Sequence, residues 1–92
     1  MRSITINENE IVIKMSKDFL AKIVSEYSDL IEEVLVRNPD TFTKPTEELT
    51  QYLCTHYGFL GALVAEGGEA LKWSEEHPKE SVDFEYPDNP YI

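Results

Sequence analysis

The sequence predicts a small α+β domain. An N-terminal β-hairpin is expected to pack with a long amphipathic helix and one or two further helices, and an extended acidic segment follows at the C-terminus. Three observations support this: two β-branched segments near the N-terminus, helical periodicity from residue 19, and its loss after residue 77. The chain has 92 residues, which is the size of one domain. We therefore treat residues 1–92 as a single acidic domain.

The N-terminal segments are typical of a β-hairpin. Residues 3–6 and 10–15 are rich in isoleucine, and the three residues between them include two asparagines. Because β-branched residues favour strands and asparagine tolerates turn geometry, the pattern predicts two strands joined by a three-residue loop. A lone hairpin is only marginally stable in water, so its apolar face must pack against another element.

The next element is a long helix, for which Ser16 is a suitable N-cap. Apolar residues occupy positions 19, 20, 23, 24, 27, 30, 31, 34 and 35. This spacing keeps them on one helix face for about five turns. The helix should end near Arg37, because Pro39 disfavours helical geometry at the residue before it.

A second helical region follows the loop of residues 38–46. Thr46 and the two glutamates after it form a typical helix start. The four glycines of the chain all lie within residues 58–68, so residues 46–76 form one bent helix or two, and we expect two, at 46–57 and 59–76. After Pro78, apolar residues alternate with acids at 82, 84 and 86, which predicts an extended, strand-like segment.

The charge balance is the most informative property of the sequence. The chain has 18 acidic and 8 basic side chains, for a formal net charge of −10. Direct binding to nucleic acid or to an anionic membrane is disfavoured, since both need Lys and Arg, and a basic partner is favoured. The acidic excess recurs in every segment after residue 25. A solvated polar face is the simpler explanation for one helix, but solubilising surfaces normally mix both signs.

No motif for catalysis, cofactor binding or metal binding is present. Cys54 and His56 are two positions apart on an expected helix, so they lie on different faces, and we expect a buried thiol and a half-buried histidine. His77 is expected to cap the end of its helix. Phosphate-loop, dinucleotide and zinc-protease motifs are missing. We therefore predict no catalytic residue, no metal and no cofactor. A hydrolase that uses two carboxylates is a third possibility, after the two binding functions described below.

The candidate binding site is an array of carboxylates. Glu26, Asp29 and Glu33 share one stripe of the first helix. That helix, of about 22 residues, is about 33 Å long, and duplex DNA of that length carries about 19 charges. The net charge of one chain is only −10, so pairing of two chains in a homodimer would improve the match. The acids that we predict to stand in for phosphates are Glu26, Asp29, Glu32, Glu33, Glu47, Glu48, Glu66, Glu69, Glu75, Glu76, Glu80, Asp83, Glu85 and Asp88.

The length, the acidity, the opening MRSITINENEIVIKM and the close DFEYPDNPYI resemble the anti-restriction nuclease (Arn) proteins of T4-like phages. The resemblance covers the whole chain, but it contains no diagnostic motif from which residue roles could be transferred. It implies a DNA mimic that inhibits the host modification-dependent restriction enzyme McrBC in the bacterial cytoplasm. It also implies competition with DNA for the histone-like nucleoid-structuring protein H-NS.

The alternative is an acidic phage adaptor that binds a host regulator through an apolar helix face. In that case an apolar patch near Val36, Phe42 or Tyr91 would dominate binding. Binding that persists in molar salt would favour the adaptor, because salt screens attraction between charges.

Overall fold

The computed structural model describes residues 1–37 and 47–90, apart from the side chain of Glu48. Its α+β architecture agrees with the predicted fold class. The elements in chain order are β1 (Arg2–Ile6), β2 (Ile11–Lys14), α1 (Lys17–Leu30), the π-helical turn η1 (Ile31–Leu35), α2 (Glu47–His56), α3 (Gly58–Glu76) and β3 (Val82–Tyr86).

The three strands form an antiparallel sheet in the order β2-β1-β3. The hairpin is confirmed, and the loop is closed by Asn7, whose side-chain oxygen accepts the backbone N–H groups of Asn9 and Glu10. The extended C-terminal segment becomes β3, which pairs with β1 so that Ile4 lies opposite Phe84. The sheet therefore has two different edges, β2 on one side and β3 on the other.

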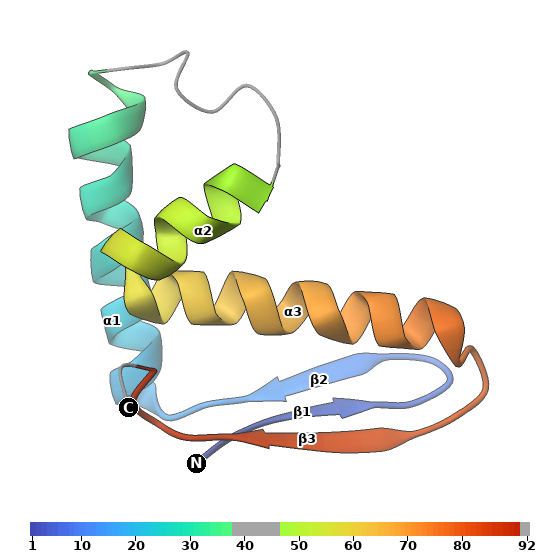
Figure 1. Ribbon diagram of the computed structural model, residues 1–92. Coiled ribbons are helices and arrows are strands. Elements are labelled where there is room, and N and C mark those ends of the chain that lie inside the picture. The colour runs from blue at the N-terminus through green and yellow to red at the C-terminus, as the bar shows by residue number, and fades with distance from the viewer. Residues whose placement is uncertain (38–46, 91–92) are drawn as a thin grey trace.

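Helix α3 lies at the centre of the molecule (Figure 1). One of its faces covers the sheet, α2 packs on the face away from the sheet, and α1 crosses its N-terminal end. One core cluster, which includes Ile4, Ile6 and Ala70, lies between the sheet and α3. A second cluster joins the three helices and includes Phe19 and Leu60. Burial of apolar side chains in these two clusters holds the helices and the sheet together.

The first helix begins as predicted but ends differently. The Ser16 side chain accepts the backbone N–H of Phe19 at 3.0 Å, so its role as N-cap is confirmed. We expected regular α-helix to about residue 37, whereas the last turn is π-helical, with the Val36 N–H bonded to the Ile31 carbonyl. A π turn holds more residues than an α turn, and Val34 within η1 is buried in the same core cluster as Leu30.

The two later helices are separate, as expected, and they pack closely at Gly61. A Cβ atom at Gly61 would lie 2.5 Å from the backbone nitrogen of Cys54, so α2 and α3 touch backbone to backbone. Our expectation of a buried thiol at Cys54 was wrong, and His56 is also exposed. At this contact the backbone of Cys54 faces α3, which leaves the thiol on the outside. His77 is the C-cap of α3, as expected.

Candidate functional site

The two flanks of α1 face opposite sides of the molecule. Lys22 and Val24 are two positions apart, so they lie about 160° apart around the helix axis. The Lys22 ammonium lies 4.9 Å from the centre of the Phe59 ring, and Lys22 lines a cavity with Asp88 and Asn89, which follow β3. The Val24 flank therefore faces away from this cavity, and Val24 is exposed.

Helix α3 is divided in the same way. Burial raises the pKa of Tyr86 on β3, and the nearby carboxylates of Glu66 and Glu69 raise it further. These two acids of α3 therefore lie toward β3. Val64 and Leu71, which are on the opposite flank of α3, line a groove with Ile11 and Ile13 of the β2 strand.

We call these two surfaces the acidic side and the apolar side. On β3, residues 83 and 85 are exposed while residues 82, 84 and 86 are partly buried against α3, so acids also cover the outer face of this strand. The acidic side consists of Glu26, Asp29, Glu33, Glu69, Glu76, Asp83 and Glu85. The name apolar side covers two parts: the groove residues Ile11, Ile13, Leu63, Val64, Gly67, Gly68 and Leu71, and the exposed α1 residues Leu20, Val24 and Tyr27.

Two of the predicted acids have internal contacts that stabilise the fold. The first is Glu66, which forms an ion pair with the Nη1 atom of Arg2. Arg2 is 3% exposed, donates from Nε and Nη2 to the Pro87 carbonyl, and places its guanidinium 4.2 Å from the centre of the Phe19 ring. This buried cation joins β1, α3 and the residue after β3. No sequence pattern indicates this role of Arg2, because it depends on three segments that are far apart in the chain.

The second is Glu26, which links α1 to the start of α3. Its Oε1 atom accepts the backbone N–H of Leu60 at 2.6 Å. The first N–H groups of a helix have no partner within the helix, and a carboxylate there also interacts favourably with the helix dipole. The side chain of the N-cap residue, Tyr57, makes no capping hydrogen bond. Glu26 therefore supplies a capping hydrogen bond from another helix.

Three further predicted acids have weaker or exposed contacts. Asp88 pairs with the N-terminal amine at 2.8 Å, and Glu80 lies 3.8 Å from the Nε2 atom of His77. The Tyr57 hydroxyl donates to Glu33 over 3.4 Å. Burial raises the pKa of Tyr57, and the charge of Glu33 raises it further. All three of these acidic residues remain exposed.

The other described acids of the predicted set are exposed, and none forms an ion pair with residues 1–37 or 47–90. Two cations close to the acidic side, Arg2 and Lys22, are paired with Glu66 and Asp18, whereas Lys72, between Glu69 and Glu76 on α3, forms no ion pair among the described residues. The side chain of Glu48 lies outside the described residues. The exposed acids are Asp29, Glu32, Glu47, Glu69, Glu75, Glu76, Asp83 and Glu85.

The sequence placed the apolar stripe of α1 on one helix face without indicating which positions are buried. In the structure Leu20, Val24 and Tyr27 of this stripe are 50%, 56% and 52% exposed. The width of the stripe was the available signal, because positions 19 and 24 lie about 140° apart around the axis. Val36, at the patch we expected for an adaptor, is 70% exposed. The other two residues expected there, Phe42 and Tyr91, lie outside the described residues.

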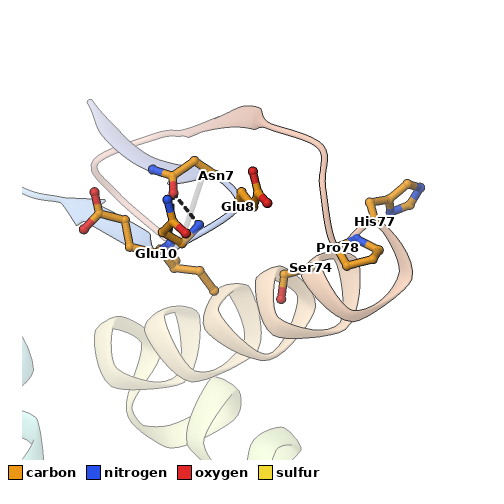
Figure 2. Close-up of a pocket in the computed structure, with 8 residues that line it drawn as sticks. Asn7, Glu8, Glu10, Ser74, His77 and Pro78 are labelled. Carbon is orange, nitrogen blue, oxygen red and sulfur yellow. Dashed lines mark hydrogen bonds between the residues drawn. The ribbon is translucent and has the colours of Figure 1, made fainter.

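A cavity of about 480 Å³ lies between the hairpin loop and the end of α3 (Figure 2). Its lining includes Glu8, Glu10 and His77, and the His77 ring stacks on Trp73 with centroids 4.4 Å apart. In Figure 2 the carboxylates of Glu8 and Glu10 point in different directions and do not converge on one point. The cavity therefore lacks the convergent polar groups that are typical of a ligand site.

Within the described residues, no helix is long and apolar enough to cross a membrane, and no three potential metal ligands gather at one place. Comparisons with family models, with curated proteins and with solved structures found no match. Function must therefore be inferred from the charges, shapes and contacts of the surface.

Proposed function

We propose that this chain is a DNA mimic, a non-enzymatic protein whose carboxylates occupy the cationic DNA-binding surface of a host protein. The observation that supports this is the acidic side, where α1, α3 and β3 all carry exposed carboxylates that form no ion pair among the described residues. Because helices and a strand hold these groups, little conformational freedom is lost when a partner binds. A field of one sign also speeds the encounter with a basic partner.

The charge density limits how much DNA one chain can replace. The molecule is 43 Å long on its longest axis, and duplex DNA of that length carries about 25 charges at one per 1.7 Å. The formal net charge of the chain is −10. A single chain therefore reproduces less than half of the charge of the DNA that it would displace, and we expect it to match a short part of a DNA-binding surface.

The resemblance to Arn proteins indicates which partners to test first. It directs the proposal to McrBC and to H-NS in the cytoplasm of an infected bacterium. In both cases the proposed mechanism is competition, in which the acidic side of this chain and DNA exclude one another from the same basic surface. No bond is made or broken.

The test is displacement of labelled duplex DNA from purified McrBC and from purified H-NS across a salt series. We expect displacement at low salt that weakens as salt rises, because counterions screen the attraction. The double variant D83N/E85Q should displace DNA several-fold less well than the unchanged chain. The matched control is E8Q/E10Q, which changes the net charge equally but alters the hairpin loop instead of the acidic side.

Two results would contradict the proposal. The first is no displacement of DNA from either protein at low salt. The second is an equal loss in both double variants, which would show that total charge alone matters and that the arrangement on the acidic side does not.

The adaptor remains a second candidate because of one observation, the half-exposed flank formed by Leu20, Val24 and Tyr27. An adaptor that bound its partner through this flank would keep the partner in molar salt, since burial of apolar surface does not depend on attraction between charges. It would also bind equally well in the D83N/E85Q variant.

A further inference from the structure

We propose that the free edge of β3 binds an extended basic segment of a partner protein, which adds to the three-stranded sheet as a further strand. The inference does not depend on the DNA-mimic proposal, because a strand can add to β3 whether or not the chain displaces DNA from a host protein. Three observations support it: the direction of the backbone groups of β3, the position of its acids, and the difference between the two edges of the sheet.

The first observation is the hydrogen-bond register of the sheet. The N–H of Asn7 donates to the Glu10 carbonyl at 3.0 Å, and these two residues continue the register of β1 with β2. In an antiparallel pair of strands, hydrogen-bonded and non-hydrogen-bonded residue pairs alternate. The odd-numbered residues of β1 therefore bond to β2, and the even-numbered residues of β1 bond to β3.

The same alternation determines which backbone groups of β3 are free. Ile4 of β1 lies opposite Phe84, so Phe84 bonds to β1. Asp83 and Glu85 each direct one N–H and one C=O away from the sheet, and no turn, loop or cap of the described residues bonds to these groups. β3 lies at one edge of the sheet (Figure 1). Unpaired groups along such an edge are a template for another strand, and extended peptides bind in this way.

The second observation identifies the occupant. Asp83 and Glu85 are exposed on the face of the sheet away from α3, whereas Phe84 packs toward α3. In an added strand, the residues opposite the two acids would place their side chains on this same outer face. Lysine or arginine at two alternate positions would therefore meet the two carboxylates. The residue between them would lie beside Phe84, so we expect it to be apolar.

The same acids make a second copy of this chain an unsuitable occupant. If β3 paired with β3 of another copy, Asp83 and Glu85 of the two chains would be cross-strand neighbours, and like charges in such positions are destabilising. Charged residues on edge strands protect natural proteins from association of this kind. A basic segment removes the repulsion, so it is the occupant that the charges of β3 favour.

The third observation is the contrast with the β2 edge. By the same register, Ile11 and Ile13 of β2 direct their backbone groups away from the sheet, so both edges offer free groups. Lys14 is the one charged residue of β2, and it lies on the same face as Glu85, because both are opposite Ser3 of β1. A basic segment would therefore be repelled at the β2 edge and attracted at the β3 edge.

The test begins with amide hydrogen exchange of the full chain, followed by NMR. In the free chain, exchange should be fast at Asp83 and Glu85 and slower at Phe84, because only Phe84 bonds to β1. The probe is a short capped peptide in which lysine and valine alternate. Its addition should slow exchange at Asp83 and Glu85 at least tenfold. The same peptide methylated at the backbone nitrogens of its lysines keeps its charge but cannot donate to β3, so it should not slow this exchange.

Two variants separate strand pairing from attraction between charges. E85Q removes one carboxylate and keeps the backbone N–H, whereas E85P removes both, and proline is tolerated in an edge strand where its nitrogen faces solvent. In chemical-shift titrations we expect E85Q to bind the peptide several-fold more weakly than the unchanged chain, and E85P at least tenfold more weakly than E85Q. E8Q, in the hairpin loop, is the matched control for charge and should bind as the unchanged chain does. Circular dichroism checks that each variant folds.

The inference would be overturned if the peptide does not bind at low salt. It would also be overturned if the peptide binds without slowing exchange at Asp83 and Glu85, or binds equally well after methylation, because the acids would then attract cations without strand pairing. Equal binding by E85P and E85Q would overturn it in the same way. If E85P does not fold, the methylated peptide makes the same comparison on the unchanged chain.

Discussion

The acidic side and the apolar side are built from the same two helices, yet they have opposite properties. Helix α1 carries Glu26, Asp29 and Glu33 on one flank and the exposed Leu20, Val24 and Tyr27 on the other. Helix α3 carries Glu66 and Glu69 toward β3, and Val64 and Leu71 toward β2. The comparison teaches that the charge of a small domain indicates the class of its partner, while the segregation of charge indicates which surface meets that partner.

The acids of α3 and α1 also differ among themselves. Glu66 is paired with a buried arginine, whereas Glu69, three residues later, is exposed and has no ion pair among the described residues. In the same way Glu26 bonds the start of α3, whereas Asp29 is exposed. Neighbouring acids with the same sequence pattern thus have separate roles, one in stability and the other on the surface.

The largest effect should come from the buried cation beneath the acidic side. R2A leaves the partly buried carboxylate of Glu66 and the carbonyl of Pro87 without their partner, and loss of one member of a buried pair typically costs about 3–5 kcal/mol. Denaturant unfolding measures this loss. K14A on β2 is the control and should change stability by no more than about 0.5 kcal/mol. Equal effects in the two variants would mean that Arg2 contributes no more than an exposed base.

Two glycines of α3 should respond in opposite directions to the same substitution. In G61A the new methyl group would overlap the backbone of Cys54, and we expect a loss of about 2–3 kcal/mol. In G68A, on the apolar side, the methyl group meets nothing within 4 Å, and the gain in helix propensity should stabilise the chain by about 0.5–1 kcal/mol. Thermal unfolding of both variants measures these opposite changes in stability. A G61A variant as stable as the unchanged chain would contradict the close contact of α2 with α3.

A smaller effect should separate the structural from the exposed acids. E26A leaves the backbone N–H of Leu60 without its acceptor, so we expect a loss of about 1–2 kcal/mol. D29A removes an exposed acid from the same flank and should change stability by no more than about 0.5 kcal/mol. Chemical denaturation of the two variants tests this difference, which should vanish if the Glu26 contact does not contribute to stability.

The smallest effect concerns alkaline pH. Because the folded state raises the pKa of Tyr57 above its ordinary value of 10.0, the folded chain holds this proton more tightly than the unfolded chain. The resulting stability is complete below about pH 10 and is lost as the pH rises through the folded pKa. Y57F should therefore lose less stability between pH 9 and pH 11 than the unchanged chain, as measured by denaturant midpoints. Parallel pH curves for the two proteins would exclude this contribution of Tyr57.

Much of the fold could be predicted because it depends on local patterns. The β-branched segments, the Ser16 cap, the break before Gly58 and the alternation of residues 82–86 are properties of neighbouring residues, and each corresponds to an element of the structure. The π-helical turn η1 and the exposed Cys54 could not be predicted in this way. They depend on how α1 and α2 meet other elements, which no short segment encodes.

The candidate site was predictable in composition but not in arrangement. The sequence by itself determined the net charge, the periodic acids and the width of the apolar stripe on α1, because these follow from residue order and helix geometry. Only the tertiary structure decided that Arg2 and Leu60 engage Glu66 and Glu26, and that Leu20, Val24 and Tyr27 stay exposed. The physical reason is that burial and pairing are set by contacts between segments distant in the chain, and α3 covers one flank of α1 while leaving the other free.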